Sequence, residues 1–341
     1  MIQIKKINGD LLSMHNCLVL KRLLLLLFAL FIASSSWIAH ASNYPNKTIR
    51  LIVPFEPGGS SDITARIVAE EMRKILGQTI IVENLGGVGG SRGSEVVAKA
   101  NPDGYILLWG NVAPIAINQH LYKNLNYDSQ KNLTAISLGT IFPNVLVVQP
   151  GLKSNTFLSF IAQSKKDYSN LTYASAGNGS STHLASAWLN DLLGSKWLHV
   201  PFKGGGPALL AIASGQVDFY FSAIPSALPF IKAGKVFALA TTGKVRDPSL
   251  PNVPTVAEQG FPQFEVINWN GLFAPANTPP EIIQQLSKAI LDALASPTVK
   301  EKLAAQGAMT QPMKPQEFSK FIAEESIKWE KLVKLANASI E

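Results

Sequence analysis

The sequence predicts an α/β protein of two lobes, each built on a mostly parallel sheet. Short β-rich runs alternate with Gly/Ser-rich loops and amphipathic helical stretches along most of the chain, a pattern typical of parallel α/β folds. The chain has 341 residues, more than the roughly 250–300 that one hydrophobic core usually serves. A hydrophobic fraction of 47% with only 16% charged residues excludes a disordered chain.

Residues 1–41 are predicted to be a cleaved secretory signal peptide rather than part of the fold. Lys21 and Arg22 precede an apolar run over 23–33, and small residues then lead to a cleavage site after Ala41. A membrane anchor is the alternative, but a spanning helix needs about 20 apolar residues, and serines at 34–36 interrupt this run. The start of translation stays open between Met1 and Met14.

Removing this segment changes the charge and the thiol content of the chain. The full chain carries 30 Lys and Arg against 23 Asp and Glu, a net charge of +7. The segment holds four of the basic residues, one of the acidic residues and the one cysteine, which leaves 26 against 22, or +4. The remaining 300 residues have no thiol for a disulfide or zinc site and no run of Lys or Arg. We therefore expect no nucleic-acid partner.

The first part of the mature chain repeats the strand–loop–helix pattern. Ile63, Ile67 and Met72 recur at helical spacing, and Gly77 is a suitable residue to end that helix. The predicted strands here are 49–55, 79–83 and 105–109, and the predicted helices are 62–76 and 94–99.

The pattern resumes after a polar stretch around 127–132 and gives way to a helical tail. Pro207 suits the first turn of a helix, and Gly194 suits a helix end. Strands are predicted at 145–149, 171–175, 198–202, 217–222, 236–241 and 269–275, and helices at 157–166, 182–193, 207–214, 281–294, 298–306 and 315–336. We expect two separate sheets, with residues 42–142 and 264–341 in the first lobe and 143–263 in the second.

Glycine-rich loops between strand and helix are the main candidates for a binding site. A helix N-terminus leaves backbone N–H groups unpaired and carries roughly half a positive charge, so it stabilises an anion without a cationic side chain. Four such loops occur, at 56–61, 86–93, 176–181 and 203–206. Any one of them could simply connect strand to helix, but together they favour an anion-binding cleft between the lobes.

Sequence signatures of enzymes and metal sites are missing from the chain. There is no Gly-x-Gly-x-x-Gly fingerprint, no phosphate-binding Gly-x-x-x-x-Gly-Lys-Ser/Thr loop and no Gly-x-Ser-x-Gly elbow. His183 follows a Gly/Ser loop, yet as a general base it would need a nucleophile and an orienting acid, and neither can be identified. We expect it to shape the loop, and we expect no catalysis, no metal and no cofactor.

Five further side chains leave two interpretations open. Asp62 is expected to organise its loop, or alternatively to recognise a ligand amine, and Asp218 to brace a neighbouring loop or to touch the ligand. Phe55 and Phe202 each end a strand and either pack in the core or line an apolar part of the cleft. Lys203 either pairs with an anion or stays solvated.

The order of these motifs resembles the Bug-type extracytoplasmic solute receptors, which are the substrate-binding proteins of tripartite tricarboxylate transporters. The first loop, Pro54 to Asp62 with Ala65-Arg66, carries the first part of the resemblance. It continues through motifs in order along the mature chain, at 82–90, 101–105, 173–184, 199–208, 225–227 and 269–275. Departures are small, with Ala174 where a glycine is frequent and Ser222 where an acidic residue is common.

The resemblance implies a type II periplasmic-binding-protein fold, a periplasmic location and a small organic carboxylate held in the cleft between two lobes that close on it. Integral membrane subunits of the transporter are the implied partners, and we expect a monomer. The class of acid stays open among di- and tricarboxylates, aromatic acids and acidic amino acids. The expected ligand-binding residues are Phe55, Pro57, Gly58, Gly59, Ser60, Ser61, Asp62, Asn111, Val112, Ser175, Ala176, Gly177, Asn178, Gly179, Ser180, Thr182, His183, Phe202, Lys203 and Asp218.

Two other functions compete with transport. A receptor of this kind could instead dock on a membrane kinase as a ligand sensor, which the sequence does not separate from transport. An exported hydrolase using Ser180 and His183 is the third hypothesis, and it predicts turnover of ester substrates that is lost in Ser180→Ala.

Overall fold

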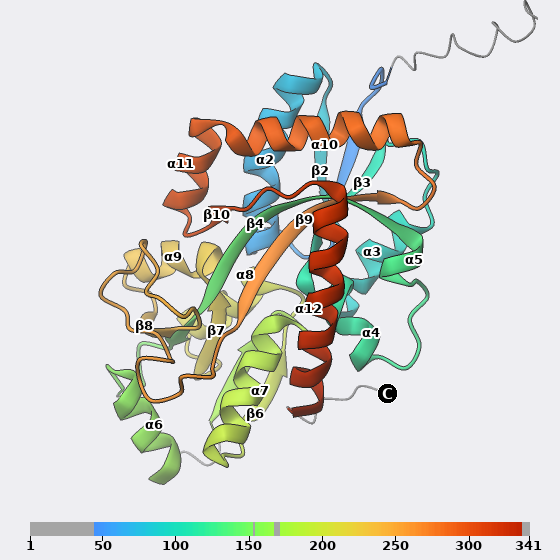
Figure 1. Cartoon of the computed structure of the whole chain (residues 1–341). Helices are drawn as coiled ribbons and strands as arrows, with labels where there is room; N and C mark the ends of the chain where they lie inside the picture. Colours follow the sequence, from blue (N-terminus) through green and yellow to red (C-terminus); the bar gives the residue numbers. More distant parts are fainter. Residues whose placement is uncertain (1–43, 153, 167–170, 336–341) are drawn as a thin grey trace, which may run out of the picture. The chain divides into compact units, whose positions relative to one another are not determined.

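The computed structural model describes residues 44–152, 154–166 and 171–335 (Figure 1). The predicted signal peptide, with its cleavage site, lies outside these described residues. From Pro45 onward the chain forms one compact unit. In the described part of the chain, no helix combines the length and the apolar character that crossing a membrane requires.

The described strands form one continuous mixed sheet rather than two separate, mostly parallel ones. Its order is β2-β1-β3-β9-β4-β7-β5-β6, with β8 and β10 also pairing with β4. Parallel pairs lie toward the two ends of this order, and every pair that involves β4 or β9 is antiparallel. The strands are β1 Ile49–Val53, β2 Ile80–Asn84, β3 Ile106–Asn111, β4 Leu133–Val148, β5 Thr172–Ser175, β6 Leu198–Pro201, β7 Phe219–Ala223, β8 Phe237–Thr241, β9 Ile267–Pro275 and β10 Met309–Thr310.

Strand β4 joins the two halves of this sheet. Its first part pairs with β9 from Leu133 to Pro143, and its last part pairs with β7 and β8 from Asn144 to Val148. Figure 1 shows β4 and β9 running side by side through the middle of the unit. The sequence predicted only the end of β4, because bulges near Ala135 and Leu138 shift its pairing register and so break the strict alternation that marks a strand.

Helices pack on the sheet close to the predicted places. α2 contacts β2, α10 and α11, while α7 and α8 contact β7, and α12 contacts β4 and α7. The helices are α2 Ser60–Leu76, α3 Ser91–Ala98, α4 Asn118–Leu121, α5 Ser129–Asn132, α6 Phe157–Lys166, α7 Ser181–Leu193, α8 Gly205–Ala213, α9 Ile224–Lys232, α10 Pro280–Ala295, α11 Pro297–Ala305 and α12 Pro315–Leu335, with short helical turns η1 Val88–Gly90 and η2 Ala113–Ile117. The sequence did not predict α4, α5, α9 or the two short helical turns.

Several helices begin earlier than the sequence indicated. α2 begins at Ser60 rather than Asp62, because Gly59 takes the extended N-cap conformation with φ −81° and ψ 166°. α8 begins at Gly205, two residues before Pro207. Each early start places small residues in the first helical turn, where the backbone N–H groups have no partner within the helix.

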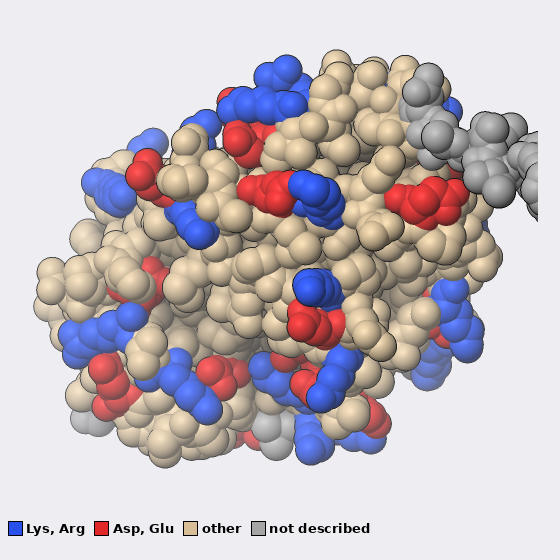
Figure 2. All heavy atoms as spheres, turned by 45° about the horizontal axis from the view of Figure 1, so that its top comes forward, with Lys and Arg blue, Asp and Glu red and all other residues tan. Residues whose placement is uncertain are grey.

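Charges on the face shown in Figure 2 are mixed in sign, with basic and acidic side chains side by side. Ion pairs account for part of this pattern. Lys302 of α11 lies 3.3 Å from Glu70 of α2, and Lys288 lies 2.6 Å from Asp292 on α10. These pairs are solvent-exposed, so each contributes little to stability.

A buried carboxylate fixes α12 against the sheet. Glu325 is 8% exposed, and its Oε2 accepts hydrogen bonds from the indole nitrogens of Trp269 on β9, at 2.9 Å, and Trp329 on α12, at 2.8 Å. Lys328 lies 3.2 Å from the other carboxylate oxygen. Because β9 also supplies residues near the candidate site, this contact holds one wall of that site in place.

Glu325→Ala leaves two buried indole N–H groups without an acceptor. At about 1–3 kcal/mol for each unsatisfied donor, we expect the free energy of unfolding to fall by about 2–4 kcal/mol. Urea unfolding followed by tryptophan fluorescence measures the change. The matched control is Glu324→Ala, whose side chain is 65% exposed and should change stability by less than about 0.5 kcal/mol. Equal effects in the two variants would contradict this assignment.

Candidate functional site

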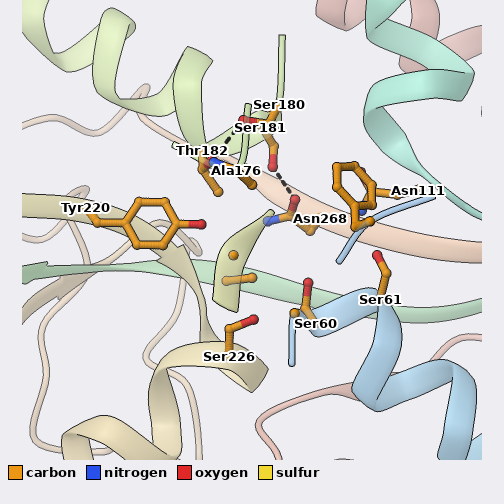
Figure 3. A pocket seen from close by; sticks show the side chains of 14 residues that line it. Ser60, Ser61, Asn111, Ala176, Ser180, Ser181, Thr182, Tyr220, Ser226 and Asn268 are labelled. Carbon is orange, nitrogen blue, oxygen red and sulfur yellow. Dashed lines mark hydrogen bonds between the residues drawn. The ribbon is translucent and has the colours of Figure 1, made fainter. Parts of the chain in front are cut away.

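A pocket lies where four helices begin (Figure 3). Its cavity volume is about 30 Å³, within about 400 Å³ of space free of protein atoms that is partly open to solvent. The first turns of α2, α7, α8 and α9 contribute most of its wall, and strands β3, β7 and β9 and the loops after β1 and β5 contribute the rest. The lining residues are Phe55, Gly59, Ser60, Ser61, Asn111, Ala176, Ser180, Ser181, Thr182, Gly205, Tyr220, Ala223, Ser226 and Asn268.

The start of α2 presents Gly59, Ser60 and Ser61 to the pocket. Ser60 directs its hydroxyl inward (Figure 3), and Gly59 caps the helix without a side-chain hydrogen bond. Ser61 Oγ accepts a hydrogen bond of 2.8 Å from Asn270 Nδ2 on β9, which fixes the first turn against the sheet. The first N–H groups of α2 are therefore directed at the pocket, with no side chain of their own loop covering them.

The start of α7 faces α2 across the pocket. Ser180 is the N-cap, and its Oγ accepts from the backbone N–H of His183 at 3.2 Å. Thr182 Oγ1 accepts from the Ala176 N–H at 2.9 Å and so holds the preceding loop. Ser181 Oγ donates to Asn268 Oδ1 of β9, a contact drawn in Figure 3.

The starts of α8 and α9 complete the wall. Gly205 is the first residue of α8, and Ala223 is the N-cap of α9, and neither helix has a side-chain cap. Ser226, in the first turn of α9, and Tyr220 of β7 direct their hydroxyls into the pocket from one side, while Asn111 lies on the other (Figure 3). Four helix N-termini thus meet at one small space.

The electrostatics of the pocket come from the backbone rather than from charged side chains. No Lys, Arg, His, Asp or Glu is among its described lining residues. Burial raises the pKa of the Tyr220 hydroxyl well above its usual range, so this group is neutral and able to donate. Unpaired N–H groups and helix dipoles make such a pocket favourable for an anion. In the described part of the chain, no cluster of His, Cys, Asp and Glu could hold a metal ion.

Comparison with known proteins identifies the family. The sequence matches the tripartite tricarboxylate transporter family receptor over residues 64–338. The chain belongs to this receptor family. BugT of Bordetella pertussis is 36% identical over 321 residues, which cover 93% of this chain and 98% of BugT.

Solved structures place the receptor among periplasmic binding proteins and confirm the two-lobe α/β fold. The periplasmic binding protein BugD is 33% identical, covers 87% of this chain and 100% of its own, and has a TM-score of 0.84. The Rhodopseudomonas palustris protein MatC with bound malate is 36% identical over 85% of this chain and 100% of its own, with a TM-score of 0.81. The R. palustris protein Rpa4515 with adipate is 30% identical over 87% and 99%, with a TM-score of 0.85.

Eight of the residues predicted from the sequence line the pocket of the receptor, and six lie in two hollows beside it. The eight are Phe55, Gly59, Ser60, Ser61, Asn111, Ala176, Ser180 and Thr182. One hollow contains Gly177 and Asn178, opposite the glycine-rich loop at 87–90, and the other contains Pro57 and Gly58. Phe202 and Lys203 belong to both hollows. The loop at 86–93, expected to bind an anion, therefore lies beside the pocket rather than in its wall.

The other six predicted residues support the site from outside the pocket. Asp62 accepts from the Gly58 N–H at 3.0 Å and pairs with Arg66 at 2.8 Å, so it organises the loop. Asp218 accepts from the Thr172 N–H at 2.8 Å and braces β5. The remaining four either pack in the core or make hydrogen bonds that hold the 176–181 loop. They are Val112, Ser175, Gly179 and His183.

Six lining residues were missed by sequence reasoning: Ser181, Gly205, Tyr220, Ala223, Ser226 and Asn268. Two of them carry a usable signal, because Ser181 and Gly205 lie within or beside predicted loops. The others reach the pocket through the pairing of β7 and β9 with β4, which short-range patterns do not reveal.

His183 belongs to a buried aromatic stack. Its ring lies 4.0 Å from that of His199, which in turn lies 4.9 Å from Tyr173. His183 Nδ1 accepts from the Gly179 N–H at 3.2 Å, and Ser180 Oγ donates to the Gly177 carbonyl at 2.6 Å. The imidazole therefore supports the loop, and Ser180 is bonded to the backbone rather than to this ring.

This stack should make the stability of the receptor depend on pH. Burial lowers the pKa of His183 to about 4, and burial together with the neighbouring ring lowers that of His199 to about 3. The pKa of a histidine in the unfolded chain is about 6.5. Below that pH, the unfolded chain therefore binds protons at these two histidines that the folded chain does not bind. Stability should therefore be full above pH 6.5 and fall as the pH drops, by up to about 1.4 kcal/mol per pH unit for each histidine.

Urea unfolding at pH 7, 6 and 5 measures this slope above the range in which most carboxylates titrate. We expect the double variant His183→Gln, His199→Gln to be less stable at pH 7 but to show a flatter dependence between pH 6.5 and 5. An unchanged slope in the double variant would show that other groups control the acid sensitivity.

Proposed function

We propose that this protein is an exported receptor that captures a small organic carboxylate and delivers it to the membrane subunits of a tripartite tricarboxylate-type transporter. The observation that carries the proposal is the meeting of four helix N-termini at a pocket with no charged lining side chain. Such a pocket stabilises a carboxylate through charge-assisted hydrogen bonds from backbone N–H groups and hydroxyls.

Family membership supports the choice of ligand and partner. Two receptors of similar structure hold malate and adipate, which are carboxylates that place oxygen acceptors at both ends. The transporter partner follows from the family's description as a receptor of tripartite tricarboxylate transporters. Export through the predicted signal peptide of residues 1–41 would bring the receptor to the periplasm, where we propose that it acts as a monomer.

Closure of the two lobes is the proposed mechanism of capture. With the lobe boundaries predicted above, loop contacts cross between lobes: a Cβ at Gly206 would lie 2.9 Å from the Pro57 carbonyl oxygen, and Tyr122 Oη donates to the Asn178 carbonyl at 3.2 Å. These contacts support a closed arrangement around the pocket. Closure removes water, and the lower local dielectric strengthens each hydrogen bond to the ligand.

A binding role fits the site better than hydrolysis. Ser180 Oγ donates to a backbone carbonyl, and the His183 ring accepts from a backbone N–H, so the pair lacks the hydrogen bond that activates a nucleophile. The low pKa of the buried His183 also makes it a weak base. We propose that the receptor works without catalysis, cofactor or metal.

Titration calorimetry against a panel of carboxylates tests the proposal. We expect one or more of succinate, malate, adipate, benzoate and aspartate to bind at one site, and Ser60→Ala to weaken that ligand by about 10- to 100-fold, because it removes a hydroxyl donor to a charged group. Ser319→Ala, an exposed serine of α12, is the control and should leave affinity unchanged. No binding by any panel member, with a correctly folded protein, would contradict the proposal.

Gly206→Ala tests closure separately from ligand contacts. Gly206 does not line the pocket, and its backbone conformation accepts alanine, but the added Cβ meets Pro57 across the cleft. We expect the thermal midpoint without ligand to stay unchanged and the ligand affinity to fall by about tenfold or more, because the closed state becomes less populated.

The matched control for closure is Gly151→Ala, whose Cβ meets only the flexible side chain of Gln149. It should bind like the wild type. If Gly206→Ala also binds like the wild type, closure through this contact is not part of capture.

A further inference from the structure

The loop between β5 and α7 contains an asparagine followed by a glycine, Asn178-Gly179. In such a pair the glycine nitrogen can attack the side-chain carbonyl carbon of the asparagine, because the glycine has no side chain to obstruct the approach. Asparagine is accordingly one of the thermolabile residues. The described part of the chain holds one other pair of this kind, Asn270-Gly271 on β9, which provides an internal comparison.

The two asparagines differ in what holds their side-chain amides. Asn270 is fully buried, its Nδ2 donates to Ser61 Oγ at 2.8 Å, and its Oδ1 accepts from Thr64 Oγ1 at 3.4 Å. Asn178 is half-buried and lines the hollow of about 210 Å³ beside the pocket. Within the described residues its carbonyl accepts from Tyr122 Oη at 3.2 Å, and its side-chain amide is not hydrogen-bonded. The amide of Asn178 is therefore free to react, and that of Asn270 is held.

The nitrogen of Gly179 faces a group that can accept its proton. The Gly179 N–H donates to His183 Nδ1 at 3.2 Å, and burial lowers the pKa of this ring to about 4, so the ring is neutral and able to accept. Glycines stand on both sides of Asn178, with φ of +126° at Gly177 and +76° at Gly179. Neither neighbour therefore has a side chain that shields the amide.

We propose that Asn178 is a site of spontaneous deamidation, which turns its amide into a carboxylate and weakens the binding of the carboxylate ligand. A bond forms between the Gly179 nitrogen and the side-chain carbonyl carbon of Asn178, and the bond from that carbon to the amide nitrogen breaks. The proton of the Gly179 nitrogen passes by way of His183 Nδ1 to the departing amide group, which leaves as ammonia. Water then opens the five-membered ring and yields aspartate or isoaspartate.

The new charge lies near the start of a helix that the ligand needs. Asn178 is two residues before Ser180, the N-cap of α7, and its hollow shares Phe55 and Ala176 with the pocket. A carboxylate here competes for the positive end of α7 and repels an anion in the pocket. Lys203 in the same hollow is exposed, so solvent screens its charge and it offsets only part of this repulsion. This effect on binding rests on the proposed function, whereas the chemical step does not.

Incubation of the purified protein at mildly alkaline pH, followed by peptide mass spectrometry, tests the chemical step. Fragment masses locate each amide that becomes a carboxylate, and hydrolysis in heavy-oxygen water labels the product. We expect Asn178 to convert with time and Asn270 to keep its amide. A synthetic peptide of residues 173–184 gives the rate without the fold. An Asn178 that keeps its amide in the protein while the peptide converts would overturn the proposal.

Calorimetry measures the consequence for binding, with whichever of succinate, malate, adipate, benzoate and aspartate binds the fresh wild type most tightly. Asn178→Asp, which is the direct product, should weaken this acid by about 3- to 30-fold. The matched control Asn252→Asp adds the same charge at an exposed position outside the pocket and the hollows, and should bind like the wild type. Thermal unfolding without ligand confirms that each variant is folded.

The affinity of the wild type should also fall during incubation, in step with the conversion of Asn178. Asn178→Gln should keep its starting affinity throughout, because its longer side chain forms a ring far more slowly. If Asn178→Asp fails to fold, this comparison decides.

Unchanged affinity in Asn178→Asp, or an equal loss in wild type and Asn178→Gln during incubation, would overturn the effect on binding. Failure of the proposed function looks different. The fresh wild type would then bind none of these acids, while the conversion of Asn178 would still be measured by mass.

Discussion

The backbone N–H groups at the starts of α2, α7, α8 and α9 are the constraint on which the rest of the site depends. A helix cannot satisfy its own first N–H groups, and α2, α8 and α9 begin without a side-chain cap. Leaving several such groups around one small pocket is costly unless a ligand accepts from them. A carboxylate does this without needing Lys or Arg, whose long side chains would occupy a pocket of this size. The glycines and serines of the lining are small enough to let a ligand reach the backbone.

The mixed sheet brings these helix starts together. Strand β4 pairs with β9 at one end and with β7 at the other, so the parallel units at both ends of the sheet direct their strand-to-helix loops at one place. Two asparagines of β9 contact helix starts from both groups, since Asn268 accepts from Ser181 of α7 and Asn270 donates to Ser61 of α2 at 2.8 Å. The buried contact of Glu325 with Trp269 holds the same strand from behind. The contacts that stabilise the fold and the residues that line the pocket therefore involve the same strand, β9.

The sequence predicts the local parts of this arrangement well, and its long-range parts poorly. The periodicity of Ile63, Ile67 and Met72 places α2, and the glycine-rich loops at 56–61 and 176–181 contribute to the wall of the pocket. By contrast, Tyr220 and Ser226 enter the pocket only because β7 pairs with β4. Helix α9 was missed because prolines at 225 and 229 interrupt its pattern, although Pro225 lies in the first turn, where no N–H is needed. Lys203, a candidate by charge, lies in the hollows beside the pocket.

The most direct measurement is a crystal structure of the protein with the tightest-binding carboxylate of the calorimetric panel. We predict one carboxylate within about 3 Å of backbone N–H groups in the first turns of α2 and α7, inside the pocket lined by Ser60 and Thr182. No Lys or Arg side chain should contact it. A ligand held by Lys203 in a hollow beside the pocket, or one whose carboxylate pairs with an arginine, would contradict the account.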